Sequence, residues 1–200
     1  MEIEIINPAN GKSLGKVPAD DHASIARKYE AARTAQPAWQ NLGLAKRLEI
    51  IRRFRDRVEK DIEEAALLLT RDVGKPIAQS RNELRGLLAR FDFFLAETEK
   101  TVGAQTVLRD GHALVEEIEH EPLGVIGNIS AWNYPWFVGS NVYVPALLTG
   151  NAVLYKPSEF ALQSGLLMAR YLHEAGVPED IFAAGVGRGD AGAILLEQPI

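Results

Sequence analysis

Apolar residues recur at every third or fourth position through much of the first half of the chain, which is the period of an amphipathic helix. The clearest run spans residues 44–69, where charged side chains mostly occupy the other faces, and it predicts one long helix. Residues 74–76, Gly-Lys-Pro, end this helix and begin the next, because glycine suits a helix C-terminus and proline suits a first turn. The next helix carries a second apolar stripe and is expected to run to about Lys100.

The N-terminal segment combines a short strand with a helix. Residues 2–6 have the composition of a strand, and residues 7–11 contain the Asn, Pro and Gly that favour a turn. A first helix is predicted to begin near Asp20 or Asp21, either of which can cap it, and to end near Pro37.

The pattern changes to that of a β-hairpin in residues 105–122. An Asp110-Gly111 pair, which suits a tight primed turn, separates two short runs of alternating residues. The run at residues 114–120 carries acidic side chains on both faces, so we expect this strand to be only partly buried. A two-stranded ribbon is marginally stable alone, and two interpretations stay open: packing on a second subunit or domain, or an exposed surface hairpin.

Short apolar strands alternate with helices from Gly124 onward. The expected strands are residues 124–129, 152–155 and 181–186, and the expected helices between them are residues 136–148 and 160–175. Such alternation predicts right-handed crossovers and a parallel sheet that helices cover on both faces. The fold class is therefore α/β.

Composition narrows the classes of partner. The 200 residues are 46% hydrophobic and 24% charged, with a formal net charge of -5 and both signs interleaved, which disfavours nucleic acid and anionic membranes as partners. No apolar run approaches the roughly 18 residues of a membrane span, and the first residues lack the features of a signal peptide, so we expect a cytoplasmic protein. The chain has no cysteine and its four histidines lack ligand spacing, so we expect no metal site.

Three segments follow the three predicted strands, and ligands of parallel sheets bind at that edge. They are residues 130–135, 156–159 and 187–192, and we expect them to line one crevice. The last has the pattern G-x-G-x-x-G between a strand and a helix, which places a phosphate on a helix N-terminus. It follows the third strand rather than the first, so the alternative is a structural turn with Asp190 as the helix cap.

The other two segments contain candidate polar groups. Glu159 lies just past the second strand, where a carboxylate accepts hydrogen bonds from ribose hydroxyls and repels a 2'-phosphate. Lys156 can donate to the same ribose or to a phosphate, or it is a solvated surface charge. Asn133 offers two N–H groups that can stabilise a developing oxyanion, or it is a turn residue that caps the next helix.

Two stretches carry a family resemblance: EPLGVIGNISAWNYP at residues 121–135 and PALLTGNAVLYKPSE at residues 145–159. Together they strongly resemble the aldehyde dehydrogenase superfamily, in particular the N-terminal portion of its NAD(P)-dependent, non-phosphorylating members. The match continues in order through the motifs at residues 7–9, 37–39, 74–76 and 176–178, so it covers essentially the whole chain.

The resemblance implies roles for particular residues. Asn133 corresponds to the oxyanion-stabilising asparagine of the family. The residues that the resemblance places at the cofactor are Ile129, Ser130, Ala131, Trp132 and Asn133, the adenosine-ribose clamp of Lys156, Ser158 and Glu159, and Gly189 near the adenine. The implied cofactor is NAD, with NADP as the alternative.

The resemblance also divides the chain. Residues 1–104 are expected to form the N-terminal helical part of the cofactor domain, residues 105–122 an oligomerisation hairpin, and residues 123–200 the first strands and helices of a Rossmann-like NAD-binding sheet. By this resemblance, the sheet is expected to be incomplete and the catalytic domain to be absent from these residues. The complete protein is then expected to be a homo-oligomer.

The implied reaction is oxidation of an aldehyde to a carboxylic acid with NAD(P), through a thiohemiacetal on a cysteine. The nucleophilic cysteine and the basic glutamate of the family both lie beyond the equivalent of Ile200, so these 200 residues are expected to be inactive alone. The alternative is a truncated, non-catalytic module that binds a nucleotide or another subunit.

Overall fold

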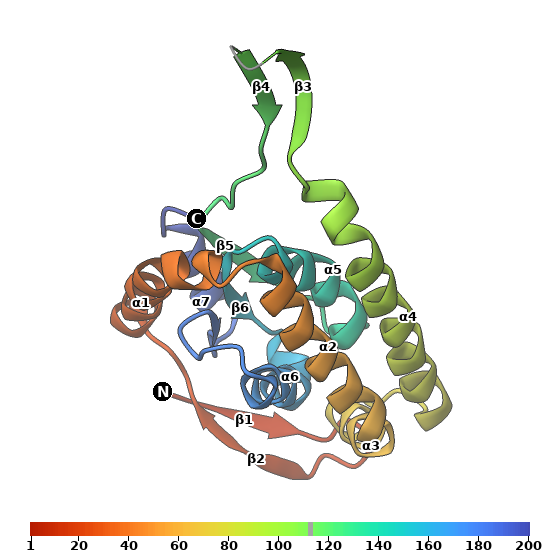
Figure 1. Cartoon of the computed structure of the whole chain (residues 1–200). Helices are drawn as coiled ribbons and strands as arrows, with labels where there is room; N and C mark the ends of the chain where they lie inside the picture. The colour runs from red at the N-terminus through yellow and green to blue at the C-terminus, as the bar shows by residue number, and fades with distance from the viewer. Residues whose placement is uncertain (112–113) are drawn as a thin grey trace.

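A parallel sheet beside a group of helices forms the body of the molecule in the computed structural model, which describes residues 1–111 and 114–200 (Figure 1). The sheet has the order β5-β6-β7, and its strands are β5 (Val125–Ile129), β6 (Ala152–Lys156) and β7 (Phe182–Ala184). Helices α5 (Pro135–Leu148) and α6 (Leu162–Ala175) connect the strands. The predicted α/β class and parallel pairing are confirmed, although β7 is shorter than the apolar run that predicted it.

Helix α1 (His22–Asn41) begins as the sequence predicts but ends later. Asp21 caps it, because its Oδ1 accepts from the Ser24 amide at 2.8 Å while Ser24 Oγ accepts from the Asp21 amide at 2.9 Å. The predicted end near Pro37 is wrong. The helix continues past this proline because Trp39 is buried and donates from its indole N–H to the Leu147 carbonyl at 2.9 Å, which anchors the last turn.

The predicted long helix is in fact two helices, α2 (Leu44–Lys60) and α3 (Ile62–Val73). Asp61 separates them with a backbone that is not helical, at φ -104° and ψ 22°. Both helices bury their apolar faces in the same core, with Phe54 and Val58 before the break and Ala65 after it, so the apolar period continues across the break and hides it. Helix α4 (Ile77–Val102) follows as predicted.

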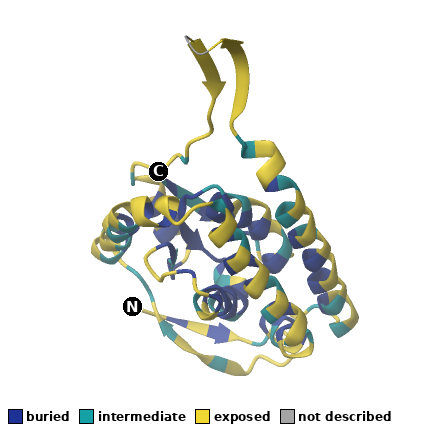
Figure 2. Cartoon of the chain, viewed as in Figure 1, coloured by how far each residue is buried: buried dark blue, intermediate teal, exposed yellow. Residues whose placement is uncertain are grey.

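One core joins the N-terminal helices to the sheet, as the buried residues in Figure 2 show. Aromatic rings fill much of it. Phe54 of α2 lies 5.2 Å from Phe91 of α4, and Tyr143 of α5 lies 5.3 Å, edge to face, from Phe182 of β7. This continuity means that the helices of residues 1–104 and the sheet support each other's position.

Two hairpins lie outside this core. Strands β1 (Glu2–Ile6) and β2 (Ser13–Pro18) pair antiparallel, and only β1 was predicted, because β2 has no regular apolar alternation and no fully buried residue. Strands β3 (Gln105–Asp110) and β4 (Leu114–Ile118) form the predicted second hairpin, which projects from the body (Figure 1). The expected partial burial is wrong for this chain, since every residue of both strands is exposed. Part of the predicted turn lies at residues 112–113, outside the described residues.

Candidate functional site

The three strand-end segments contribute to a single pocket of about 520 Å³. Trp132 follows β5, Glu159 and Phe160 follow β6, and Arg188 follows β7. The rest of the lining comes from β1, the turn after it and the end of α3, namely Ile3, Glu4, Ile5, Ile6, Pro8, Asp72 and Val73. The prediction that the three segments meet in one crevice is therefore confirmed.

Lys156 and Glu159 form an ion pair at the edge of β6. Lys156 is 5% exposed and its Nζ lies 3.1 Å from Glu159 Oε2, so the interpretation of Lys156 as a solvated surface charge is wrong. Burial opposes ionisation of Glu159, but its own backbone amide and the Lys156 ammonium hold the pKa of the carboxyl below its ordinary value. Glu159 is thus an anion that faces the pocket at neutral pH.

Ser158 lies between these two charges and is buried. Its Oγ accepts from the Phe160 amide at 3.3 Å and so caps the short helix η1 (Glu159–Ala161). This turn sets the direction in which Glu159 leaves the strand. The first segment is fixed to the second, because Ile129 is in register with Lys156 and the Ser130 amide donates to the Lys156 carbonyl at 3.0 Å.

The glycine-rich segment turns directly into helix α7 (Gly189–Leu196). Arg188 is the N-cap, and Asp190 lies inside the first turn with its Oδ1 accepting from the Ala191 amide at 2.8 Å, so the assignment of Asp190 as the cap is wrong. A Cβ at Gly187 would collide with Ala191, which shows why glycine is needed there. Gly189 is exposed, and a Cβ there would meet no described atom within 4 Å, so its backbone is open to a ligand.

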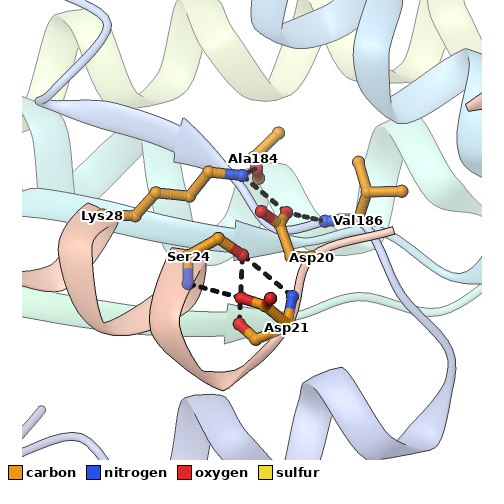
Figure 3. A network of polar contacts seen from close by, with 6 residues as sticks. All are labelled: Asp20, Asp21, Ser24, Lys28, Ala184 and Val186. Atoms are coloured by element: carbon orange, nitrogen blue, oxygen red, sulfur yellow. Dashed lines mark hydrogen bonds and ion pairs between the residues drawn. The ribbon is translucent and has the colours of Figure 1, made fainter. Parts of the chain in front are cut away.

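A clamp from the N-terminal segment fixes the end of β7 (Figure 3). Asp20 Oδ2 accepts from the Val186 amide at 2.7 Å and pairs with Lys28 at 2.5 Å, while Lys28 also donates to the Ala184 carbonyl at 2.7 Å. The Asp20 amide in turn donates to the Val186 carbonyl at 2.7 Å. The backbone just before the glycine-rich segment is therefore held from both sides.

Asn133 lies in the connection between β5 and α5. The interpretation that it caps α5 is wrong, because Tyr134 is the N-cap and makes no side-chain cap. Asn133 is exposed, and no hydrogen bond within residues 1–111 and 114–200 involves its side-chain amide. Its backbone carbonyl, in contrast, accepts from Lys75 Nζ at 2.6 Å. The backbone is anchored while the side-chain donors remain free for a ligand.

Two residues that anchor this connection escaped the sequence analysis. Lys75 was considered only as part of a helix boundary, and Glu83 was not considered at all. Glu83 is 4% exposed and accepts from the Trp136 amide at 2.9 Å. The signal that points to it is a carboxylate on the apolar stripe of α4, beside the fully buried Leu84 and three positions after the buried Ser80.

Glu159 in the pocket and Lys156 beside it have the chemical groups that a nucleotide ribose requires. A carboxylate and an ammonium 3.1 Å apart at the carboxyl end of a parallel strand provide an acceptor and a donor for ribose hydroxyls. Trp132 and Phe160 add exposed aromatic surface at the same pocket, at 53% and 64% exposure. Ile129 is the last residue of β5 and Ala131 follows it, so both lie at this edge of the sheet, although neither lines the pocket.

Metal sites and membrane-spanning helices are the two remaining features that bear on function. Across the described residues, no group of three or more His, Cys, Asp or Glu side chains is arranged to hold a metal ion. None of the helices in residues 1–111 and 114–200 combines the length and the apolar character that a membrane crossing requires.

The chain matches the aldehyde dehydrogenase family over residues 1–200. A curated relative, 3,6-anhydro-alpha-L-galactose dehydrogenase of Streptomyces coelicolor, is 33% identical over 198 residues, which are 98% of this chain and 40% of the relative. The crystal structure of an NAD-dependent aldehyde dehydrogenase from Sinorhizobium meliloti superposes with a TM-score of 0.92 at 30% identity, over 100% of this chain and 40% of that one. The crystal structure of an E. coli NADP dependent enzyme gives a TM-score of 0.90 at 29% identity, over 100% of this chain and 41% of that one.

These matches extend along the whole of this chain but only about two-fifths of each relative. They include both the parallel sheet and the helices before it, so the likeness reaches beyond the pocket to the entire fold. The chain belongs to the aldehyde dehydrogenase family.

Proposed function

We propose that the complete protein oxidises an aldehyde to a carboxylic acid with NAD. The observation that carries this proposal is the junction of the three strand-end segments. It combines an anionic Glu159 in a pocket with an Asn133 whose backbone is anchored and whose amide is free. A relative named as an NAD-dependent aldehyde dehydrogenase shares the fold over the entire chain.

Residues in and beside the pocket bind and orient the cofactor. Glu159 accepts from the ribose hydroxyls, and Lys156 holds Glu159 in place and donates to the same ribose. Ser158 fixes the turn between them, and Gly189 allows the backbone to approach the adenine side. Residues 129–132, where β5 ends, would contact the cofactor. NAD, when bound, supplies the hydride acceptor for the oxidation.

Asn133 acts on the reacting carbonyl. Its side-chain N–H groups donate to the oxygen that becomes negatively charged when a nucleophile attacks the aldehyde carbon. An amide suits this task because it donates without titrating. The nucleophile would be a cysteine thiolate, which adds to the aldehyde carbon to form a thiohemiacetal. Loss of hydride from that carbon to NAD would give a thioester, which water hydrolyses to the acid and the free thiol. These 200 residues contain no cysteine, so we propose that a further segment of the protein supplies it.

The projecting hairpin is proposed as an oligomerisation surface. Its strands expose Leu108, Val115 and Ile118 at 45%, 44% and 50%, which is apolar area that a second subunit can bury. The proposed location of the protein is the cytoplasm.

The assay that tests the function is aldehyde-dependent formation of NADH by the complete protein. A panel of aliphatic, aromatic and sugar-derived aldehydes is incubated with NAD, and absorbance of the reduced nicotinamide is followed. We expect turnover with at least one aldehyde and formation of the matching acid. Binding of NAD without turnover of any aldehyde would instead support a non-catalytic nucleotide-binding module.

A further inference from the structure

Glu83 of α4 caps the N-terminus of a different helix, α5. Its side chain is fully buried, and its Oε1 accepts from the Trp136 amide at 2.9 Å and from the Phe137 amide at 3.3 Å. A carboxylate is favourable at this end of a helix because the unpaired amides carry partial positive charge. The cap therefore comes from 53 residues earlier in the chain.

The first turn of α5 depends on this carboxylate. Pro135 has no N–H, and the Val138 amide donates to the Tyr134 carbonyl at 2.9 Å. The two remaining amides are the ones that Glu83 accepts from. Without Glu83, both would lose their partner in the described chain, because the N-cap residue offers no side-chain cap. The start of α5 is thus fixed by α4.

Lys75 extends the contact to the other side of Tyr134. Its Nζ lies 2.5 Å from Glu83 Oε2, donates to the Asn133 carbonyl at 2.6 Å, and lies 4.2 Å from the centre of the Tyr134 ring. The Lys75 side chain is 11% exposed, so the pair is well shielded from water. One ion pair therefore holds both the peptide of Asn133 and the amides that begin α5.

We propose that the Glu83–Lys75 pair is a positioning device for Asn133, which fixes the backbone position from which its side-chain amide reaches the reacting carbonyl. The proposal rests on the oxyanion role of Asn133 in the proposed function. Asn133 is exposed and its side-chain amide makes no hydrogen bond among the described residues, so the backbone that the pair holds fixes the place from which this amide reaches a ligand. A donor displaced by a fraction of an ångström loses much of its effect on the transition state.

The test compares kcat and KM in the complete protein for Glu83→Gln, Lys75→Met and Asn133→Ala. Glu83→Gln keeps an acceptor for the Trp136 amide but removes the charge opposite Lys75. Lys75→Met removes the donor to the Asn133 carbonyl and leaves the Glu83 carboxyl in place without its ion-pair partner. The matched control is Glu63→Gln, which removes an exposed carboxylate of α3 that pairs with Arg81 of α4 at 2.8 Å.

We expect Glu83→Gln and Lys75→Met each to lower kcat by about tenfold, with the KM for NAD within about twofold and the control unchanged. In the Asn133→Ala background, Glu83→Gln should cause no further loss, because the group that it positions is gone. If the pair had a merely structural role, Glu83→Gln would lower the stability of the protein. It would then lower kcat in the Asn133→Ala background as well.

Three results would overturn the inference. Unchanged kcat in both single variants, while Asn133→Ala is impaired, would remove the positioning role and leave the proposed function standing. Equal losses from Glu83→Gln with and without Asn133 would show that the pair acts independently of it. Full activity of Asn133→Ala would refute the oxyanion role itself and with it the inference. If Glu83→Gln fails to fold, the inference is tested by comparing the loss of kcat that Lys75→Met causes in the parent with the loss that it causes in the Asn133→Ala background.

Discussion

Replacing Gly165 of α6 by alanine should destabilise the protein, although alanine is the better helix former. Gly165 is buried where α6 passes the end of β6, and a Cβ there would collide with the Pro157 ring. It would lie 2.9 Å from Pro157 Cγ and 3.2 Å from the ring of Tyr155. A proline ring cannot rotate away, and Pro157 separates Lys156 from Ser158, so the strain reaches the pocket.

The size of the destabilisation by Gly165→Ala follows from two opposed effects. Gly to Ala in a helix interior gains up to about 1 kcal/mol, whereas overpacking a rigid core contact costs about 1–3 kcal/mol. The matched substitution is Gly86→Ala in α4, which is exposed and where a Cβ would meet Phe137 at an ordinary 3.8 Å. The helix gain is common to both variants, so the difference between them isolates the overpacking cost of about 1–3 kcal/mol.

Thermal unfolding of both variants under identical conditions measures this difference. About 1 kcal/mol shifts the Tm of a chain of this size by roughly 2–4 °C, so Gly86→Ala should melt above the parent and Gly165→Ala below Gly86→Ala by several degrees. Equal Tm values for the two variants would show that α6 can move away from Pro157, and would refute the claim that this glycine sets the spacing at the pocket.

Three further outcomes are expected. Burial raises the pKa of Asp20, but Lys28 and the Val186 amide together lower it by more, so the pKa lies below its ordinary value of 3.8. The stabilisation by Asp20 is therefore present above pH 3.8 and is lost as the pH falls below that value. Urea unfolding of Asp20→Ala should therefore show a deficit at pH 7 that shrinks toward pH 3, and a constant deficit would contradict this. The 200-residue chain exposes Trp132, Phe160 and Leu196 at 53%, 64% and 67%, so sedimentation velocity should show self-association; a clean monomer at high concentration would argue against it. Glu159→Gln removes the charge that opposes a 2'-phosphate, so titration of the complete protein should show weaker NAD binding and a smaller preference over NADP, and an unaltered preference would mean that Glu159 points away from the ribose.

Local patterns predicted the elements that local chemistry determines. A parallel sheet could be predicted from the apolar runs of the strands and from the glycine-terminated helices α5 and α6 that alternate with them. The sheet then brings the strand-end segments together in one pocket. Asp20 and Asp21 were both predicted as candidate caps, and Asp21 is the cap in the structure because its partner, Ser24, lies within the same turn.

Contacts between distant segments account for what the sequence did not reveal. Pro37 signals a helix end, but the burial of Trp39 against α5 overrides it. The break at Asp61 is hidden because both helices face the same core. The cap on α5 comes from Glu83, and a residue so distant in sequence cannot be found by searching for a cap beside the helix.

The most direct test of the account is the kcat of Asn133→Ala in the complete protein, measured with saturating NAD and aldehyde. The loss of one oxyanion donor should lower kcat by about 100-fold or more, while the dissociation constant of NAD stays within about twofold. Asn133→Asp should be at least as impaired, because a carboxylate repels the developing charge. Activity of Asn133→Ala equal to that of the parent would contradict the assignment of this site as the oxyanion-stabilising centre.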